Sequence, residues 1–585
     1  MLLGWFNTRA IPSRVDDAVP APRWVDALLL VALAAVGYGV MRAAAEWRAP
    51  LTPGMRIDLS PTRLPYYAGL STLRMAIAYI ISLVFSLVYA RVAASSRIAE
   101  RVMLPLLDIL QSIPILSFMP GVVLGLAAMF PGRTVGLELA AVILIFTSQA
   151  WNLAFSFHQS LITIPRELGE AASVYRLGLW RRFTKLELPY GAIALIANSM
   201  MSWAGGWFFL MASEQFTLGD KNLRLPGLGS YLAAAADAGD TRALGLGLGT
   251  LVAVIVLLDQ LLWRPLVAWS DRFKFEQTGS ADAPQSVTLD MLQRSAAVHW
   301  VQVRLLRPVF SFIDRRMSPM GGTPADAPPT QPRERARGAL VVFALAGVAL
   351  AAVLAWGAWS ALRTVASLTA GDWGYVLRCA GATFLRTSVA LLLAAAWTVP
   401  VGVAIGMNAR LARKLEPVVQ IAASVPATAV FPVLLFALLA LPGGLNMAAV
   451  ALMLLGTQWY VLFNVIAGAM AIPSDLREAA MVYHVSGWRR WKTLILPAIF
   501  PYLVTGMITA TGGAWNASIV SEYVTFAGRK VSTLGLGALI AQAADSGRFP
   551  LLLAGTLVMS AIVIAGNRLV WRRLYVLAES RFRLE

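Results

Sequence analysis

Two short polar segments, at residues 170–189 and 478–497, carry side chains that could bind a partner protein. Each begins Glu-Ala-Ala, has a tyrosine five residues after the glutamate and ends in Leu-Pro. Equivalent positions are 308 residues apart, so the segment is an internal duplication. A glutamate can pair with a basic group or cap a helix, alanines permit close approach, and aromatic side chains anchor a contact. The pattern therefore predicts a docking surface.

The candidate docking residues occupy equivalent places in the two copies, except for the glycines, which are 309 residues apart. They are Glu170, Ala171, Ala172, Tyr175, Gly178 and Trp180 in the first copy, and Glu478, Ala479, Ala480, Tyr483, Gly487 and Trp488 in the second. Apolar residues at positions 168, 172, 175, 179 and 183 follow helical spacing, which predicts one docking face along the segment. The alternative is an amphipathic loop that rests on the bilayer. Two copies in equivalent places favour the docking surface.

Other chemistry finds little support in the sequence. The one cysteine, Cys379, excludes an internal disulfide framework, and three scattered histidines (His158, His299 and His484) leave little for a metal site. The sequence contains no Gly-x-x-x-x-Gly-Lys-Ser/Thr phosphate-binding motif. We therefore expect no metal or cofactor in this chain and no enzyme activity, and any ATP hydrolysis must come from another subunit.

Composition predicts a polytopic membrane protein, because 58% of the 585 residues are hydrophobic and 14% are charged. The net charge of +18 then indicates contact with anionic lipid headgroups rather than with nucleic acid. The N-terminus lacks the short apolar core of a cleavable signal, so we expect residues 1–23 to form a cytoplasmic tail.

The apolar segments predict an all-α fold of about 12 membrane helices in two repeats. The expected spans are 24–41, 73–94, 109–131, 135–164, 188–214 and 244–263, then 339–362, 382–407, 415–441, 446–472, 497–522 and 550–571. A polar loop is expected at 42–71, and the prolines Pro114, Pro120, Pro426 and Pro432 should bend the third and ninth spans. The domains are therefore 24–275 and 339–585, joined by a cytoplasmic linker, 276–338, with an amphipathic helix near 287–313.

Six spans per repeat is an even number, so the two repeats are parallel rather than inverted. Lysine and arginine are more frequent on the side of the Glu-Ala-Ala segments than on the other side in both repeats. The positive-inside rule places these segments and both termini in the cytoplasm.

These residues resemble the transmembrane subunits of ATP-binding-cassette importers, whose signature is Glu-Ala-Ala, a glycine and an apolar-Leu-Pro ending. Residues 106–114 (LLDILQSIP), the Ser-Glu that ends the fifth span and the following Gly-x-Gly loop resemble the nitrate, sulfonate, taurine and bicarbonate branch. The resemblance implies a type I importer fold with two fused permease domains in a prokaryotic inner membrane. It also implies two cassette ATPases that bind ATP and magnesium, and an external substrate-binding protein.

The sequence departs from that family at the glycine. The family's glycine stands six residues after the glutamate, where this chain has Arg176 and His484, with Gly178 and Gly487 further on. This spacing predicts that the turn in the docking segment is shifted.

Polar side chains within spans are candidates for a translocation path, because they are costly in lipid. The resemblance implies that the fifth span of each repeat lines that path. The candidates are Gln149, Asn198, Ser202, Gln458, Thr509 and Thr511. The alternative for each is a bond to a neighbouring helix. Glu214 and Glu522, which end the fifth spans, are interpreted as satisfied helix-end carboxylates, and the alternative is a substrate-repelling or proton-linked role. Arg378 and Arg386 are interpreted as solvated positive charges, and the alternative is that they attract an anion.

Three hypotheses follow. The first is a permease that imports a small solute, in the first place an anion such as nitrate, sulfonate or bicarbonate, by alternating access driven by separate ATPases. The second is a secondary transporter with two parallel repeats, which should carry buried ionisable residues for ion coupling. The third is a membrane scaffold organised by the linker, which leaves the duplicated bent spans unexplained.

Overall fold

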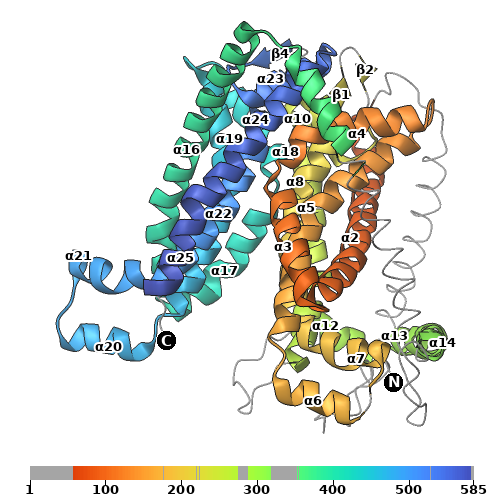
Figure 1. The fold of residues 1–585 in the computed structure, drawn as a ribbon, viewed down its shortest axis with the longest axis vertical. Helices are drawn as coiled ribbons and strands as arrows, with labels where there is room; N and C mark the ends of the chain where they lie inside the picture. Colours follow the sequence, from red (N-terminus) through yellow and green to blue (C-terminus); the bar gives the residue numbers. More distant parts are fainter. Residues whose placement is uncertain are drawn as a thin grey trace.

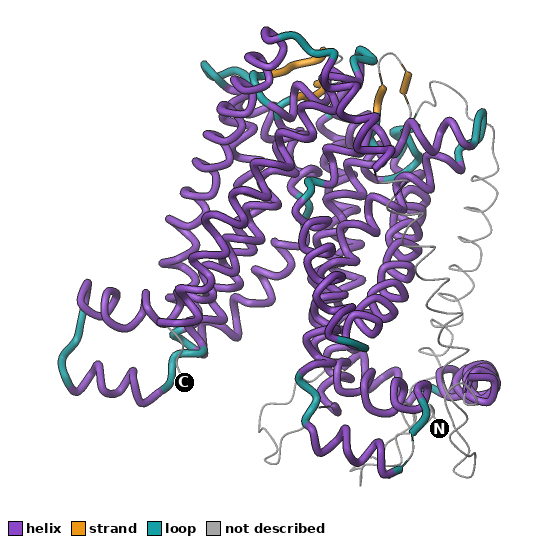
Figure 2. Tube along the Cα trace, in the orientation of Figure 1, coloured by secondary structure: helices purple, strands orange, loops and turns teal. Residues whose placement is uncertain are grey.

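The computed structural model describes residues 57–175, 177–218, 221–222, 224–273, 287–317, 352, 355–526 and 529–581. These residues are almost entirely helical (Figure 2), and the strands among them form two small antiparallel hairpins. The hairpins are β1 (Thr217–Leu218) with β2 (Lys221–Asn222), and β3 (Tyr523–Phe526) with β4 (Arg529–Ser532).

The helices repeat in the same order in the two halves, which confirms the parallel duplication. The first half contains α2 (Leu64–Ala94), α3 (Arg97–Ser112), α4 (Ile115–Met129), α5 (Val135–Ile162), α6 (Arg166–Val174), α7 (Leu179–Arg182), α8 (Leu188–Glu214), α9 (Leu228–Ala238), α10 (Thr241–Leu258) and α11 (Arg264–Ser270). The second half contains α16 (Ala370–Gly406), α17 (Ala409–Ser424), α18 (Ala427–Leu438), α19 (Gly444–Met470), α20 (Ser474–Val482), α21 (Gly487–Arg490), α22 (Leu496–Ser521), α23 (Leu536–Asp545), α24 (Phe549–Gly566) and α25 (Arg572–Arg581).

Short π-helical turns recur at matching places in the two halves. They are η4 (Phe183–Glu187) and η8 (Trp491–Ile495), then η5 (Asp259–Trp263) and η9 (Asn567–Trp571). Because η4 and η8 continue the helix, α7 runs without a break into α8, and α21 runs into α22.

The described part of the chain has eight helices that are long and apolar enough to cross a membrane, and up to 10 if each bent pair is one span. The bent pairs are α3 with α4, at 90°, and α17 with α18, at 81°. Each break falls at an Ile/Val-Pro pair whose proline, Pro114 or Pro426, precedes the second helix, as expected from the missing amide donor. Of the two remaining expected spans, 24–41 lies outside the described residues and 339–362 lies mostly outside them.

Several expected boundaries are wrong. Helix α2 begins at Leu64, inside the stretch expected to be a loop, and α3 begins at Arg97, well before the span expected to start near residue 109. Helix α16 begins at Ala370, well before residue 382, because a Thr369–Asp372 capping box starts it. Pro65 and two tyrosines at the start of α2, and charged residues at the starts of α3 and α16, conceal these helix ends from a reading based on hydropathy alone.

The described part of the linker is helical but is not one helix. It forms α12 (Val287–Arg294), α13 (Ala296–Val301) and α14 (Arg307–Met317), with a π-helical turn, η7 (Gln302–Leu306), between the last two. The expected domain boundaries stay predictions.

Figure 1 shows two bundles that meet at one end and lie apart at the other. We call the end with the β-hairpins the hairpin end and the end with α6 and α20 the motif end. The contacts between the halves are reciprocal: α4 packs on α22 and α18 on α8, while α3 packs on α24 and α10 on α17. Such a pattern is that of two copies related by a pseudo-two-fold axis.

Candidate functional site

The docking segments form a pair of short helices at the motif end of each half (Figure 1). Helix α6 ends at Val174 and α20 ends at Val482, so the apolar residues do not form the single helical face that their spacing predicted. The face is interrupted because the chain turns sharply before α7 and α21. The side chains of Tyr175 and Tyr483 are 78% and 80% exposed at these turns.

The turn after α20 lies where the family has its glycine, so the expected shift is wrong for the second copy. His484 has a φ of 52°, in the left-handed region. The amide of Val485 donates to the carbonyl of Ala480 at 2.8 Å, and that of His484 to Met481 at 3.0 Å. This is the Schellman pattern that usually ends on glycine. Gly487 also has a positive φ, 54°, whereas Gly178 does not, at −61°.

The other predicted docking residues differ in exposure. Glu170 and Ala171 are exposed on α6, Ala172 is buried, and Gly178 and Trp180 are half-buried. In the second copy the exposed members are Glu478, Gly487 and Trp488, while Ala479 and Ala480 are half-buried. Each half thus presents exposed apolar side chains at the motif end, which come in the first copy from Val174, Tyr175 and Leu179 and in the second from Met481, Val482, Tyr483 and Trp488.

An arginine ties the first docking segment to a membrane helix. Arg91, near the end of α2, donates to the carbonyl of Leu179 at 2.7 Å and pairs with Glu187 at 3.1 Å. In the second half Arg477 of α20 donates instead to the carbonyl of Ala469, at the end of α19, at 2.8 Å. The two docking segments are therefore attached to their bundles in different ways.

A buried ionic cluster fixes the hairpin end of the first half. Arg74 of α2 pairs with Glu214, the last residue of α8, at 2.7 Å, and binds both carboxylate oxygens of Glu138 on α5 at 2.5 and 2.7 Å. Ser71 donates to Glu214 at 2.6 Å. Arg74 and Glu214 are at most 2% exposed, so each charge depends on its partner.

The second half repeats this cluster with two changes, since Thr383 takes the place of Ser71 and Asn446 that of Glu138. Arg386 of α16 pairs with Glu522 at 2.5 Å, and Thr383 donates to Glu522 at 2.7 Å. Asn446 replaces Glu138 and accepts from Arg386 at 3.0 Å. Arg386 also donates to Thr533, which follows β4, at 3.1 Å. The interpretation of Arg386 as a solvated charge is therefore wrong, whereas that of Glu214 and Glu522 as satisfied helix-end carboxylates is confirmed.

The same carboxylates explain the Gly-x-Gly loops. The amides of Gly229 and Gly537, in the first turns of α9 and α23, donate to Glu214 at 2.7 Å and to Glu522 at 2.8 Å. The acid thus satisfies amides that have no partner within the helix. A Cβ on Gly227 or Gly535 would lie 2.3 or 2.1 Å from the carboxylate, so only glycine lets the loop approach this closely.

Sequence reasoning missed Arg74 and Glu138. A signal was present, because Ser71-x-x-Arg74 recurs as Thr383-x-x-Arg386 at an offset of 312 residues, which is also the offset of the bent spans. A paired polar motif inside two equivalent apolar spans indicates a built cluster.

Among the path candidates, the structure brings Asn198 and Ser202 together. Asn198 donates to Ser156 of α5 at 2.9 Å, and Asn152 of α5 donates to Ser202 at 3.0 Å. Gln149 is buried between α2 and α5, where it contacts Met75.

The remaining candidates belong to the second half. Gln458 accepts from Trp397 at 3.1 Å, between α19 and α16. Thr509 and Thr511 donate to backbone carbonyls of their own helix, α22, and of the two Thr509 is the more exposed. The assignment of these six residues to a path stays a prediction.

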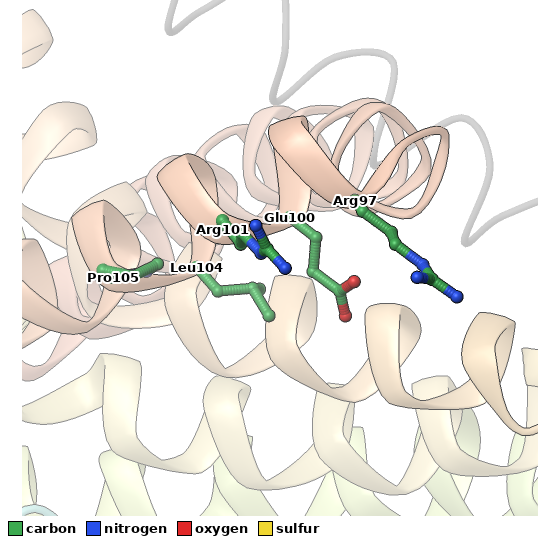
Figure 3. A pocket seen from close by; sticks show the side chains of 5 residues that line it. All are labelled: Arg97, Glu100, Arg101, Leu104 and Pro105. Carbon is green, nitrogen blue, oxygen red and sulfur yellow. The ribbon is translucent and has the colours of Figure 1, made fainter.

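A hollow of about 560 Å³ is lined by Arg97, Glu100, Arg101, Leu104 and Pro105 (Figure 3). All five residues lie on α3, and Glu100 is 3.6 Å from His158 of α5. Because its lining comes from one helix, this hollow does not join the two halves.

The fold and these sites together define a polytopic helical permease built from two parallel repeats. Residues 82–263 and 398–583 each match the family described as binding-protein-dependent transport system inner membrane component. The chain belongs to this family and contains its domain twice, in line with a fused double permease.

Curated relatives include three permeases. The chain is 29% identical over 166 residues to the nitrate import permease protein of Leptolyngbya laminosa, covering 28% of this chain and 56% of the relative. It is 30% identical over 143 residues to the bicarbonate transport system permease protein of Synechococcus elongatus, covering 24% and 50%. It is 25% identical over 196 residues to the taurine transport system permease protein of Escherichia coli, covering 33% and 68%. The chain spans about half the length of the nitrate and bicarbonate relatives.

The Arg386→Ala variant should lose about 3 kcal/mol or more of stability, because it leaves the carboxylate of Glu522 buried and without its charged partner. Thermal unfolding of the purified chain in detergent measures this loss. Arg378→Ala, which removes an exposed arginine two turns earlier on α16, is the matched control and should unfold at the wild-type temperature. Equal unfolding temperatures for the two variants would show that the cluster contributes little.

The Gly535→Ala variant should be destabilised by about 1–3 kcal/mol, because the new methyl group would overlap the carboxylate of Glu522. Gly381→Ala, at a helical position on α16 with open space around it, is the control and should match or exceed wild-type stability. The same unfolding assay compares them. A Gly535→Ala protein as stable as Gly381→Ala contradicts the close approach.

Proposed function

We propose that this chain is the complete membrane pore of an ATP-driven importer, with one cassette ATPase bound to each docking segment on the cytoplasmic side. The observation that carries this proposal is the continuity of α7 with α8 and of α21 with α22. The exposed tyrosines lie four residues before these continuous helices, so a partner bound there can transmit its movement to the fifth span through the short turn between them. Movement of both fifth spans then alternates access to the path between the halves.

The motif end is the cytoplasmic end in this proposal. Basic residues gather there on and beside α7 and α21, which suits a surface that faces anionic lipid headgroups. They are Arg181, Arg182 and Lys185 in the first half and Arg489, Arg490 and Lys492 in the second. Both termini lie in the cytoplasm in this arrangement, and the hairpin end faces outward, where a substrate-binding protein delivers the solute.

The solute is a small anion in this proposal. The names of the matched relatives refer to nitrate, bicarbonate and taurine, all small and polar. ATP and magnesium are bound by the partner ATPases, and the path candidates Gln149, Asn198, Ser202, Gln458, Thr509 and Thr511 contact the solute or hold the helices that do.

A secondary transporter is the second candidate. It needs an ionisable group that changes its charge state or ion occupancy during transport. The buried arginines of the hairpin-end clusters are instead paired with Glu214 and Glu522. These carboxylates also accept hydrogen bonds from amides at the starts of α9 and α23. A cluster whose charged groups are all paired suits a rigid contact between helices better than a site of ion exchange.

Aspartate at the exposed tyrosines tests the ATPase contact. Tyr175→Asp with Tyr483→Asp buries two new charges in the proposed contact, so the double variant should lose co-purification with the ATPase and transport-coupled ATP hydrolysis. Each single variant should lose part of both. Val576→Asp, at an exposed apolar position of α25 at the same end, is the control and should behave as wild type. Full ATPase retention by the double variant, or solute uptake driven by an ion gradient without any ATPase, would refute the proposal.

A further inference from the structure

The two fifth spans carry unlike side chains on equivalent faces. On α8 the positions are Ala197, Met201, Ala204 and Phe208, and on α22 they are Thr505, Thr509, Gly512 and Asn516. Each set follows the 4-3-4 spacing of one helical face, and the two sets are 308 residues apart throughout. We call them the α8 stripe and the α22 stripe. One is apolar, and the other carries two hydroxyl groups and a carboxamide.

The α8 stripe faces the second half, because contacts with that half flank it on both sides. Beside it, Met200 accepts from Gln420 of α17 at 2.9 Å. On its other side, a Cβ built on Gly205 would lie 3.5 Å from the hydroxyl of Tyr460 on α19. At the hairpin end Phe208 packs into a cluster that includes Trp515 and Ile519 of α22.

The α22 stripe meets the first half at the hairpin end and is flanked on one side by α19 of its own half. A Cβ built on Gly513 would lie 3.6 Å from the ring of Tyr460, the residue that Gly205 approaches from α8. Asn516 accepts from the amide of Leu116, at the start of α4, at 3.2 Å. Leu116 and Ala212, both from the first half, lie in one buried cluster with Trp515. The stripes therefore converge at the hairpin end and face each other across the boundary between the halves.

Toward the motif end the same stripes become exposed. Ala197, Met201, Thr505 and Thr509 are exposed, whereas Ala204, Phe208, Gly512 and Asn516 are half-buried. This gradient is expected of a path that is closed at the hairpin end and open toward the motif end. The exposed positions form an apolar wall on α8 and a polar wall on α22.

From this arrangement we propose that the path accepts a singly charged organic anion, with its charged group against the α22 stripe and its apolar body against the α8 stripe. The inference rests on the proposed function and narrows its solute class. Hydroxyl hydrogens of Thr505 and Thr509 now point to carbonyls of their own helix at 3.0 and 3.2 Å and can rotate to solute oxygens. Opposite them, the side chain of Met201 adapts to apolar groups of varied shape.

The charge limit follows from the residues of the stripes. None of the eight positions is charged, and the hydroxyl groups of Thr505 and Thr509 are the exposed donors among them, which suit one anionic group. A second negative charge would be desolvated without a further partner on either wall. A small inorganic anion gains nothing from the apolar wall. Asn198 and Ser202 lie beside the α8 stripe but donate to or accept from α5, so their polar groups already have partners.

Cysteine protection tests the two walls together. Cys379 is buried and is the chain's one cysteine, so Cys379→Ala gives a background for Thr509→Cys and Met201→Cys. The full transporter, purified with its ATPase, is labelled with a charged methanethiosulfonate in the presence of 1-butanesulfonate or nitrate. At twice its Kd, butanesulfonate should slow labelling of both cysteines about threefold, because labelling follows the free fraction. Nitrate should leave Met201→Cys unprotected.

Val576→Cys, exposed but outside both stripes, should label at one rate in all conditions. If Met201→Cys or Thr509→Cys does not fold, Ala197→Cys or Thr505→Cys, one turn nearer the motif end of the same stripe, takes its place. Equal protection by nitrate, protection at α22 alone, or no protection at either cysteine overturns the inference. ATP hydrolysis measured on the same samples separates the solute class from the proposed function. Retained hydrolysis without protection rejects only the solute class. A chain that never binds the ATPase rejects the proposed function.

Discussion

The rest of each half depends on one buried ion pair. It joins the glutamate that ends the fifth span to an arginine of α2 in the first half or of α16 in the second. Glu214 with Arg74 joins α8 to α2, and Glu522 with Arg386 joins the end of α22 to α16, although the paired residues are far apart in the sequence. The same carboxylate satisfies the start of α9 or α23. Because a buried charge cannot be left unpaired at low cost, the ion pair opposes separation of these elements at the hairpin end of each half. In the proposed function, motion applied at the motif end is then expressed as rotation or separation of whole bundles.

Fusion of the two domains allows the halves to differ. In a homodimer every change appears twice, whereas here Glu138 has become Asn446 and the arginine of the second cluster also holds the segment after β4. The docking segments are likewise anchored through Arg91 in one half and Arg477 in the other. Fusion likewise allows the α8 and α22 stripes, at the boundary between the halves, to carry unlike side chains.

Much of the fold could be predicted from the sequence, because the duplicated signature, the apolar runs and the prolines each have a local cause. The fifth span, the bends at Pro114 and Pro426 and the parallel repeat are confirmed. The helix start at Leu64 was missed because a proline and two tyrosines follow it, and that at Arg97 because charged residues follow it. The clusters were missed because pairing of Arg74 with Glu138 and Glu214 is a property of the tertiary fold, which spacing along one segment does not report. The turn at His484 was misplaced because its position depends on backbone conformation rather than on residue type.

The proposed function implies that ATP binding by partner subunits changes the distance between the motif ends of the two bundles, which lie apart in this structure, by bringing them together. Ile162 and Met470 are equivalent, exposed residues at the motif ends of α5 and α19, outside the docking helices. Spin labels at these two positions, in the Cys379→Ala background with the ATPase bound, report the separation of the halves by electron paramagnetic resonance. The account predicts a shorter distance with ATP than without nucleotide. A distance that ATP leaves unchanged, in a complex that hydrolyses ATP, would contradict it.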